Sequence, residues 1–218
     1  MTIHNLAQQN SIVSTFLSEM RDTTIQRDPM RFRTNIQRIG QCIAYEISKT
    51  LNYTPTPVTT PFQTIQVPLP SSQIVITSIL RAGNPFHTGF LSYFDKAENA
   101  FVSAYRKYAP DHLSFEIITE YLAAPDINGK TLILCDPMLA TGGSMEAAYR
   151  ALLTHGTPAH VHIVSIIASQ QAIENVQHIF PNETTTVWTA AIDPILNEQS
   201  YIIPGLGDAG DLAYGDKL

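Results

Sequence analysis

The chain has 218 residues, of which 44% are hydrophobic and 15% are charged, and it carries a formal net charge of −6. This length suits one large α/β domain or two small ones with a sizeable core, and the composition excludes an intrinsically disordered chain. The acidic balance argues against a nucleic-acid partner, which normally meets a basic face, whereas a small anionic substrate can be held by a few Arg residues and backbone N–H groups.

Three further features bear on location. No run of eighteen apolar residues occurs, so no membrane partner is expected. The N-terminal residues lack the basic start and apolar segment of a signal peptide. Cys42 and Cys135 lie far apart and show neither metal-ligand spacing nor the pattern of a disulfide framework. We therefore expect a cytoplasmic protein with reduced thiols.

The N-terminal third predicts helices followed by an extended arm. Residues 11–22 and 30–52 are expected to form amphipathic helices, because apolar side chains recur at spacings of three and four, as at Ile36, Ile39, Ile43 and Ile47. Residues 52–70 contain five prolines and predict an extended connector with edge strands that wraps the body. We expect residues 1–70 to be an arm of a single domain, with only helices before residue 52.

The next stretch predicts a buried strand and a hairpin. The continuous β-branched run at 74–80 is typical of a strand covered on both faces, and a loop at 81–86 leads to a short helix from residue 87. Two β-rich runs joined by a polar stretch predict a β-hairpin over residues 100–122. We expect this hairpin to be a flap that folds over a bound ligand and keeps out water.

The remaining elements alternate between strand and helix. Strands are expected at 131–135, 161–168 and 185–192, with helices at 144–155 and 170–179 between them. Alternation of this kind implies an α/β fold with an open, mainly parallel sheet, right-handed crossovers and helices on both faces.

One strand-to-helix junction carries a chemical signature. Asp136 ends a buried strand, and the turn Thr141, Gly142, Gly143 and Ser144 opens the next helix. Ligands of parallel sheets bind beyond the carboxyl ends of the strands, and helix N-termini bind phosphate through free N–H groups. With Asp136 accepting hydrogen bonds from ribose hydroxyls, the pattern predicts a ribose 5-phosphate site. The alternative is an ordinary turn with Thr141 or Ser144 as helix N-cap.

Longer motifs in the same chain resemble those of a known family. The stretch CDPMLATGGS (135–144) resembles the phosphoribosyl pyrophosphate (PRPP) motif of type I phosphoribosyltransferases, in the form typical of uracil phosphoribosyltransferases. The stretch TAAIDPILNEQSYIIPGLGDAGD (189–211) resembles that family's uracil-binding region. Shorter matches are SILRAG (78–83), AYRK (104–107) and RDTT…FR…AYE within 21–46. The matches run over nearly the whole chain in the family's order.

The resemblance implies the type I phosphoribosyltransferase fold as a single domain over residues 1–218, with a uracil-binding hood at 189–218. It implies an enzyme of pyrimidine salvage, in which uracil displaces pyrophosphate from PRPP to give UMP. Charge develops on the leaving group and on the ribose, so electrostatic positioning is expected to supply most of the catalysis. No general base is singled out by the sequence.

The resemblance also assigns residues to PRPP. Asp208 and Arg106 are the implied catalytic residues, and a guanidinium suits a departing pyrophosphate because it stays charged and bonds two oxygens at once. Magnesium is the implied cofactor, bound through PRPP and Asp208. The implied PRPP-binding residues are Arg81, Arg106, Asp136, Pro137, Met138, Leu139, Ala140, Thr141, Gly142, Gly143, Ser144 and Asp208.

The uracil contacts implied by the resemblance are backbone groups. They are the Ile202 N–H, the Gly207 carbonyl and the Ala209 N–H, with Asp208 beside them. Uracil presents acceptor, donor and acceptor along O2, N3 and O4, whereas cytosine inverts two of these contacts. A site built for such hydrogen bonds rejects the wrong base by roughly 10⁴-fold, because buried polar groups would be left unpaired.

Several positions depart from the family pattern or suggest other chemistry. Asn84-Pro85-Phe86 and Leu212 replace the residues that usually follow LRAG and GDAGD, and residues 168–173 also differ. We expect these departures to be lineage variation. His155, His160 and His162 are expected to be structural, since no Cys or carboxylate lies near them in sequence. Cys135 is not expected to be a nucleophile, because burial raises a thiol pKa.

Two other functions fit parts of the pattern. One is a non-catalytic phosphoribosyltransferase-fold regulator that binds RNA and senses nucleotides, which would need a basic face. The other is an enzyme of this fold acting on a purine base or orotate, against which the YIIPGLGDAGD stretch argues. The expected partners are uracil, PRPP and UMP, with GTP as an activator, and the resemblance implies a homodimer or homotetramer.

Overall fold

The core of the molecule is a sheet with seven strands in one hydrogen-bonded path. The computed structural model describes residues 1–108 and 115–216, with the backbone alone for 104–108 and 115–119. Along the path, each pair of neighbours is parallel except β5–β6, and β8 (Met138–Leu139) adds to β9 beside it. The mainly parallel sheet is therefore confirmed. Its order is β1 (Thr2–Asn5), β10 (Thr185–Asp193), β9 (His160–Ser169), β7 (Thr131–Cys135), β4 (Ile74–Leu80), β5 (Glu98–Tyr108) and β6 (Phe115–Ala123).

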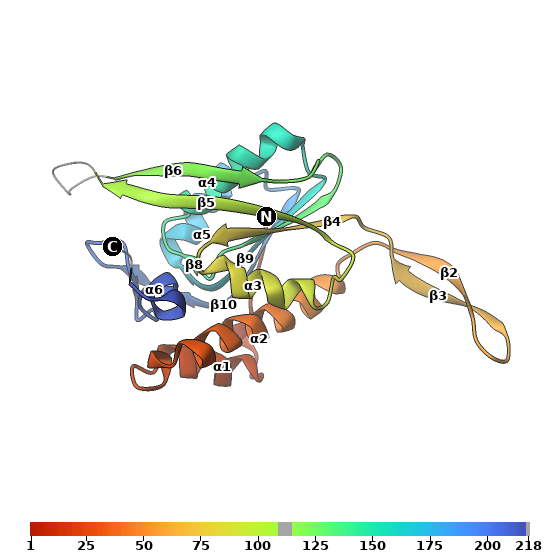
Figure 1. Cartoon of the computed structure of the whole chain (residues 1–218), viewed down its shortest axis with the longest axis horizontal. Coiled ribbons are helices and arrows are strands. Elements are labelled where there is room, and N and C mark those ends of the chain that lie inside the picture. Colours follow the sequence, from red (N-terminus) through yellow and green to blue (C-terminus); the bar gives the residue numbers. More distant parts are fainter. Residues whose placement is uncertain (109–114, 217–218) are drawn as a thin grey trace.

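Helices cover both faces of this sheet (Figure 1). On β4, Ile74 and Ile76 enter one core, and Val75 between them enters the core on the opposite face. This alternation explains why the strand is a continuous β-branched run: neither face meets water. The first core is covered by α1 (Val13–Arg21), α2 (Pro29–Ser48) and α3 (Gly83–Leu91), with residues of α6 (Ala209–Tyr214), and the second by α4 (Gly143–Leu152) and α5 (Gln170–Ile179).

Helix α2 follows the rules that predicted it. Its N-cap Asp28 accepts hydrogen bonds from Met30 N and Arg31 N, and Pro29 occupies the first turn, where its missing N–H costs nothing. The predicted Ile positions are fully buried against the sheet. Shorter elements complete the fold: η1 (Leu6–Gln8), η2 (Ile25–Arg27), η3 (Leu153–His155), β11 (Ile195–Leu196), β12 (Ile202–Ile203) and α6 (Ala209–Tyr214).

Two predictions about the N-terminal arm are wrong. The first 52 residues do not contain only helices, because β1 pairs in parallel with β10. Four residues with polar ends give no detectable strand periodicity. Residues 52–70 do not wrap the body: β2 (Tyr53–Thr59) and β3 (Thr64–Pro70) pair with each other and reach away from it (Figure 1). From here on, "the arm" means only this β2–β3 hairpin, residues 53–70.

The segment after β4 also differs from its prediction. Helix α3 begins at Gly83, so Asn84-Pro85-Phe86 lies in a helical turn rather than in a loop. Proline is tolerated in a first turn, which is why the sequence suggested a break where the helix already runs. Phe86 is fully buried, with its carbonyl 2.9 Å from where a Cβ on Gly40 would stand.

The predicted hairpin at 100–122 is present as antiparallel β5 and β6, with a register shift between Ser103 and Ala104. Its tip, residues 109–114, lies outside the described residues, and the expectation that it closes over a ligand stays a prediction. Within the described part of the chain, no helix is long and apolar enough to cross a membrane.

His160 and His162, two of the three histidines expected to be structural, each have a partner in the fold. His162 is 3% exposed, and its Nδ1 accepts a 3.1 Å hydrogen bond from Trp188 Nε1. His4 stacks on the Trp188 ring, with 3.9 Å between the two ring centroids. His160 Nε2 lies 3.0 Å from Thr186 Oγ1. Burial lowers the pKa of His162 to about 3, aided by nearby His160 and His4.

This pKa predicts a pH-dependent stability. The unfolded chain binds a proton at His162 below about pH 6.5, whereas the folded chain does not, so the free energy of unfolding should fall as pH falls from about 6.5 towards 3. The contribution of this residue reaches up to about 1.4 kcal/mol per pH unit. Urea unfolding at pH 7 and pH 5 measures it. His162→Asn, which keeps an acceptor for Trp188 but does not titrate, should show a shallower slope, and exposed His178→Gln should keep the wild-type slope. Equal slopes in all three proteins would contradict the assignment.

Candidate active site

A cleft of about 880 Å³ lies at the carboxyl ends of the central strands. It is lined by the ends of β4 and β7, the turn between β8 and α4, and the first turn of α6. Arg81, Asp136, Asp208 and Ala209 all line it, although they come from three separate segments of the sequence. The two long motifs of the sequence therefore meet in one cavity.

The β8–α4 turn is held by hydrogen bonds from β9 and α5. Ser169 Oγ donates to the Ala140 carbonyl at 2.5 Å, and Asn175 Nδ2 donates to the Thr141 carbonyl at 3.0 Å. Gly142 adopts a left-handed φ of 87° and is the N-cap of α4, without a side-chain cap bond. The alternative with Thr141 or Ser144 as N-cap is therefore wrong. The Gly143 N–H makes only a long, 3.4 Å bond to Thr141 Oγ1, and a helix N-terminus with such weakly held N–H groups is the arrangement that binds phosphate.

All but one of the residues between β7 and this turn line the cleft. Asp136 is half-buried, and its Oδ1 accepts a 3.1 Å bond from Met138 N, which fixes the carboxylate at the strand end. Met138, Leu139 and Ala140 line the cleft. Pro137 does not: it is buried, and its carbonyl accepts bonds from Ile166 N and Ile167 N in β9.

Arg81 connects the sheet to the C-terminal segment. Its guanidinium pairs with Asp211 Oδ1 at 2.7 Å and donates to the Gly215 carbonyl at 3.2 Å, while its buried Nε has no hydrogen-bond partner. Two residues on, Gly83 packs so closely that a Cβ there would lie 2.6 Å from the Cys135 carbonyl. The glycine thus allows the ends of β4 and β7, with Arg81 and Asp136, to approach each other.

The proposed base-recognition segment is more ordered than an irregular loop. Asp208 is the N-cap of α6, and its Oδ1 accepts bonds from Gly210 N at 2.8 Å and Asp211 N at 3.0 Å. Ala209 N donates to Met138 Sδ at 3.4 Å, a weak acceptor. Of the four residues expected to contact uracil, Asp208 and Ala209 line the cleft, whereas Ile202 and Gly207 do not. Ile202 is 3% exposed, and Gly207 has a φ of 90°.

Other expectations have mixed outcomes. The side chain of Arg106 lies outside the described residues, so its role stays a prediction. Asp211, Asp216, Tyr201 and Ser103 also line the cleft and were not singled out from the sequence. Asp211 and Tyr201 stand inside the quoted motif, next to residues that were chosen, whereas nothing local marks Ser103 or Asp216.

The charges in the cleft bear on magnesium. Four carboxylates line it, from Asp136, Asp208, Asp211 and Asp216, and Arg81 is the cation among the described lining residues. Carboxylate oxygens are ligands that Mg²⁺ accepts. No group of three or more His, Cys, Asp or Glu side chains in the described parts of the chain could hold a metal by itself. The donor set therefore fits an ion that arrives with phosphate oxygens and keeps waters.

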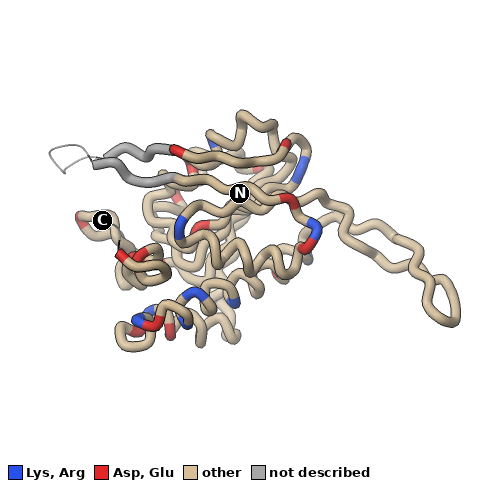
Figure 2. The backbone as a smooth tube through the Cα atoms, viewed as in Figure 1, with Lys and Arg blue, Asp and Glu red and all other residues tan. Residues whose placement is uncertain are grey.

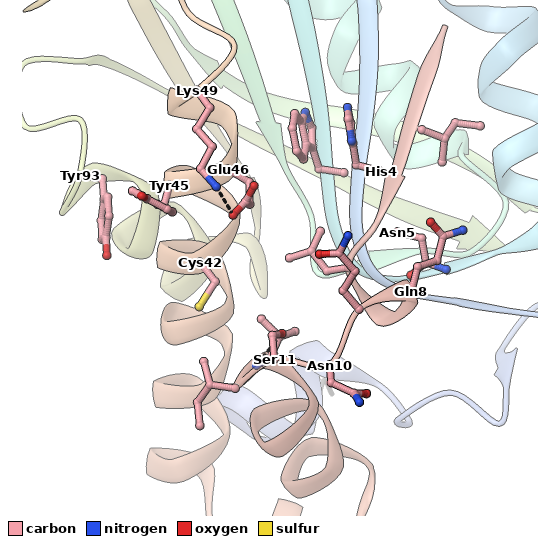
Figure 3. Close-up of a pocket in the computed structure, with 16 residues that line it drawn as sticks. His4, Asn5, Gln8, Asn10, Ser11, Cys42, Tyr45, Glu46, Lys49 and Tyr93 are labelled. Atoms are coloured by element: carbon pink, nitrogen blue, oxygen red, sulfur yellow. Dashed lines mark hydrogen bonds and ion pairs between the residues drawn. The ribbon is translucent and has the colours of Figure 1, made fainter.

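A second cavity, of about 530 Å³, lies between the N-terminal segment and α2 (Figure 3). His4 and Gln8 face it from one side, and Cys42 and the Lys49–Glu46 ion pair of 2.7 Å from the other. Burial raises the pKa of the Cys42 thiol. Neither Arg81 nor the segments 136–144 and 202–209 line this cavity, so the first cleft is the candidate active site.

Cys135 behaves as expected of a structural thiol. It is fully buried, and burial raises its pKa well above the ordinary value, with the nearby Asp136 adding to the effect. A thiol of this kind is protonated and inaccessible at neutral pH, which agrees with its exclusion as a nucleophile.

Comparisons with known proteins agree with this geometry. Residues 7–216 match a family model described as "Uracil phosphoribosyltransferase". A protein of that name from Porphyromonas gingivalis is 57% identical over 218 residues, covering 100% of both chains. One from Methanothermobacter thermautotrophicus is 37% identical and covers 94% of this chain and 93% of its own. The solved AQ2163 protein from Aquifex aeolicus superposes with a TM-score of 0.87 at 28% identity, covering 98% of each chain.

Proposed function

The chain belongs to the uracil phosphoribosyltransferase family, and from this premise we propose that the cleft between the β8–α4 turn and α6 is its active site. The protein has the type I phosphoribosyltransferase fold and is a pentosyltransferase of pyrimidine salvage, converting uracil and PRPP to UMP and pyrophosphate. The observation that supports the site is the meeting of the ribose-phosphate motif and the base motif in one cavity.

The ribose-phosphate half of PRPP fits the β8–α4 turn. Thr141, Gly142, Gly143 and Ser144 present N–H groups and hydroxyls to the 5-phosphate, and the positive end of the α4 dipole adds attraction. Asp136, fixed by Met138 N, accepts hydrogen bonds from the ribose hydroxyls. Met138, Leu139 and Ala140 shape the floor, and Pro137 contributes by holding the turn against β9.

The pyrophosphate half is assigned to Arg81 and Arg106. The unpaired, buried Nε of Arg81 is a donor that a phosphate oxygen can accept, and a bound anion competes with Asp211 for the rest of the guanidinium. Mg²⁺ bound to pyrophosphate oxygens, with Asp208 as a protein ligand, would neutralise charge on the leaving group. The carboxylates of Asp136 and Asp208 face the cleft, where positive charge develops on the ribose.

Uracil fits beside α6. The Ala209 N–H now meets only the weak Sδ acceptor of Met138, and a uracil carbonyl oxygen is a stronger acceptor. The Ile202 N–H and the Gly207 carbonyl are the further contacts that the family resemblance implies, although neither residue lines the cleft of the free protein. Because all three groups that would bond uracil belong to the backbone, selectivity between bases depends on the position of the segment 202–209.

Charge at Asp208 is the sharpest test of this site. Asp208→Asn keeps an oxygen for the α6 cap but removes the charge, so it should leave thermal unfolding unchanged and lower kcat/KM for UMP formation with Mg²⁺ by roughly 100-fold or more. Exposed Asp95→Asn is the control. Full activity in Asp208→Asn would contradict the assignment, and turnover of orotate or hypoxanthine in place of uracil would favour another base.

The β5–β6 hairpin is proposed to close over PRPP and exclude water. Limited proteolysis should then cut the free protein near Tyr108, and PRPP should suppress that cut. Cleavage at the same rate with and without PRPP would count against a closing flap.

The arm is proposed to dock on a second copy of the chain. It projects from the body and carries no charged residue (Figure 2). Phe62 in it is 96% exposed, and Leu69 and Tyr53 are also exposed. Such a surface is costly to leave in water and is typical of an interface. The family resemblance suggests a dimer or tetramer, with GTP as activator.

The molar mass of the protein in solution tests whether the arm forms an interface between copies. Phe62→Glu should lower the molar mass seen by light scattering towards that of one chain, and Phe62→Leu should keep the wild-type mass. Repeating the measurement and the UMP assay with GTP shows whether the nucleotide changes either. A wild-type mass in Phe62→Glu would place the interface elsewhere.

The cytoplasm is the proposed location. Cys42 and Cys135 are free thiols, a state that proteins of reducing compartments keep.

A further inference from the structure

Two pieces of the family motifs lie outside the cleft, and the structure brings them together. One is the start of RDTT at Arg21, the last residue of α1, and the other is Asp193, the last residue of β10. They are 172 residues apart in sequence. Neither is among the described residues that line the cleft.

The two side chains form a forked ion pair that also holds Gly205. Arg21 donates to both oxygens of Asp193, at 2.8 and 2.7 Å, and to the Gly205 carbonyl at 2.8 Å. Asp193 Oδ2 in turn accepts the Gly205 N–H at 2.9 Å. Both backbone groups of Gly205 are therefore fixed by one charged pair, and Asp193 is 4% exposed. Charge-assisted, bidentate bonds of this kind are the strongest available to a protein.

Gly205 is the tightest point of the base-recognition segment. Its φ is 60°, and a Cβ there would lie 2.0 Å from the Ile202 carbonyl. Just before it, Ile202 and Ile203 form β12, which pairs with β11. Leu206 is then 3% exposed in the core shared with α2. Gly207, Asp208 and Ala209 follow at once, so their position is set from Gly205.

We propose that Arg21 and Asp193 are positioning residues, which hold the uracil-reading segment 202–209 in its binding geometry before uracil arrives. The inference rests on the proposed active site. A segment that reads a base through backbone groups binds weakly if it must be ordered at each encounter, and an anchor formed in the free protein removes that cost. The anchor acts on base binding and leaves the phosphate-binding turn, which is held by Ser169 and Asn175, unaffected.

Conservative variants separate positioning from general stability. Arg21→Lys keeps the charge but cannot make the fork and the Gly205 bond together, and Asp193→Asn removes one strong acceptor. In both, the KM for uracil should rise by roughly 10- to 100-fold and discrimination against cytosine should weaken, while the KM for PRPP changes by less than about twofold. The matched control is Arg31→Lys, whose 3.2 Å ion pair with Glu19 joins α2 at the surface to α1, the helix that ends at Arg21. It should leave both KM values unchanged.

Wild-type protein alone gives a second test, which stands even if a variant does not fold. The Gly205 amide should exchange hydrogen about 100-fold or more slowly than an unstructured chain without any ligand. Fast exchange that slows only with UMP would overturn the proposal, as would variants that raise the KM for PRPP in parallel with that for uracil, or lower only the unfolding temperature. Absence of UMP formation by wild-type protein would instead sink the proposed function, whatever the exchange of Gly205.

Discussion

Burial of a parallel sheet on both faces determines where the rest of this chain can lie. Alternate residues of β4 enter different cores, so neither face can carry a polar ligand site, and the chemistry is confined to the strand ends. In a parallel sheet those ends share an edge. Arg81 after β4, Asp136 after β7 and Asp193 at the end of β10 therefore reach the same side of the molecule, although sequence separates them widely.

The two halves of the cleft are built differently. The β8–α4 turn follows directly from the sheet and is held to β9 and α5 by Ser169 and Asn175. The hood has two strands of two residues and a helix of six, too few regular hydrogen bonds to fix its own position. Apolar contacts of Leu206 and Ala213 hold it to the first core, and two ion pairs add charged connections: Arg21 to Asp193 and Arg81 to Asp211. Of the two pairs, Arg21–Asp193 is the more buried, so removing one of its partners should cost more than removing one from Arg81–Asp211.

Local patterns in the sequence predicted local structure well. The β-branched run of β4, the Ile spacing of α2 and the glycine turn before α4 each follow from neighbours within a few residues. The predictions that were wrong concerned elements that depend on distant partners or are very short. Strand β1 exists because β10 offers it an edge, α3 starts early because Phe86 packs beside Gly40, and the arm points outward for want of a local partner. The Arg21–Asp193 pair could not be predicted, since no local period links residues so far apart.

The proposed recognition of the base by backbone groups has a consequence for selectivity. A base read by an N–H of Ile202, a carbonyl of Gly207 and an N–H of Ala209 meets no side chain whose replacement would simply invert a donor and an acceptor. The discriminating variable is the position of the main chain, and that depends on Gly205, which alone tolerates the turn, and on the charged pair that fixes it. Substitutions that retune the choice of base in this protein are therefore expected at Arg21, Asp193 and their packing neighbours, outside the cleft itself.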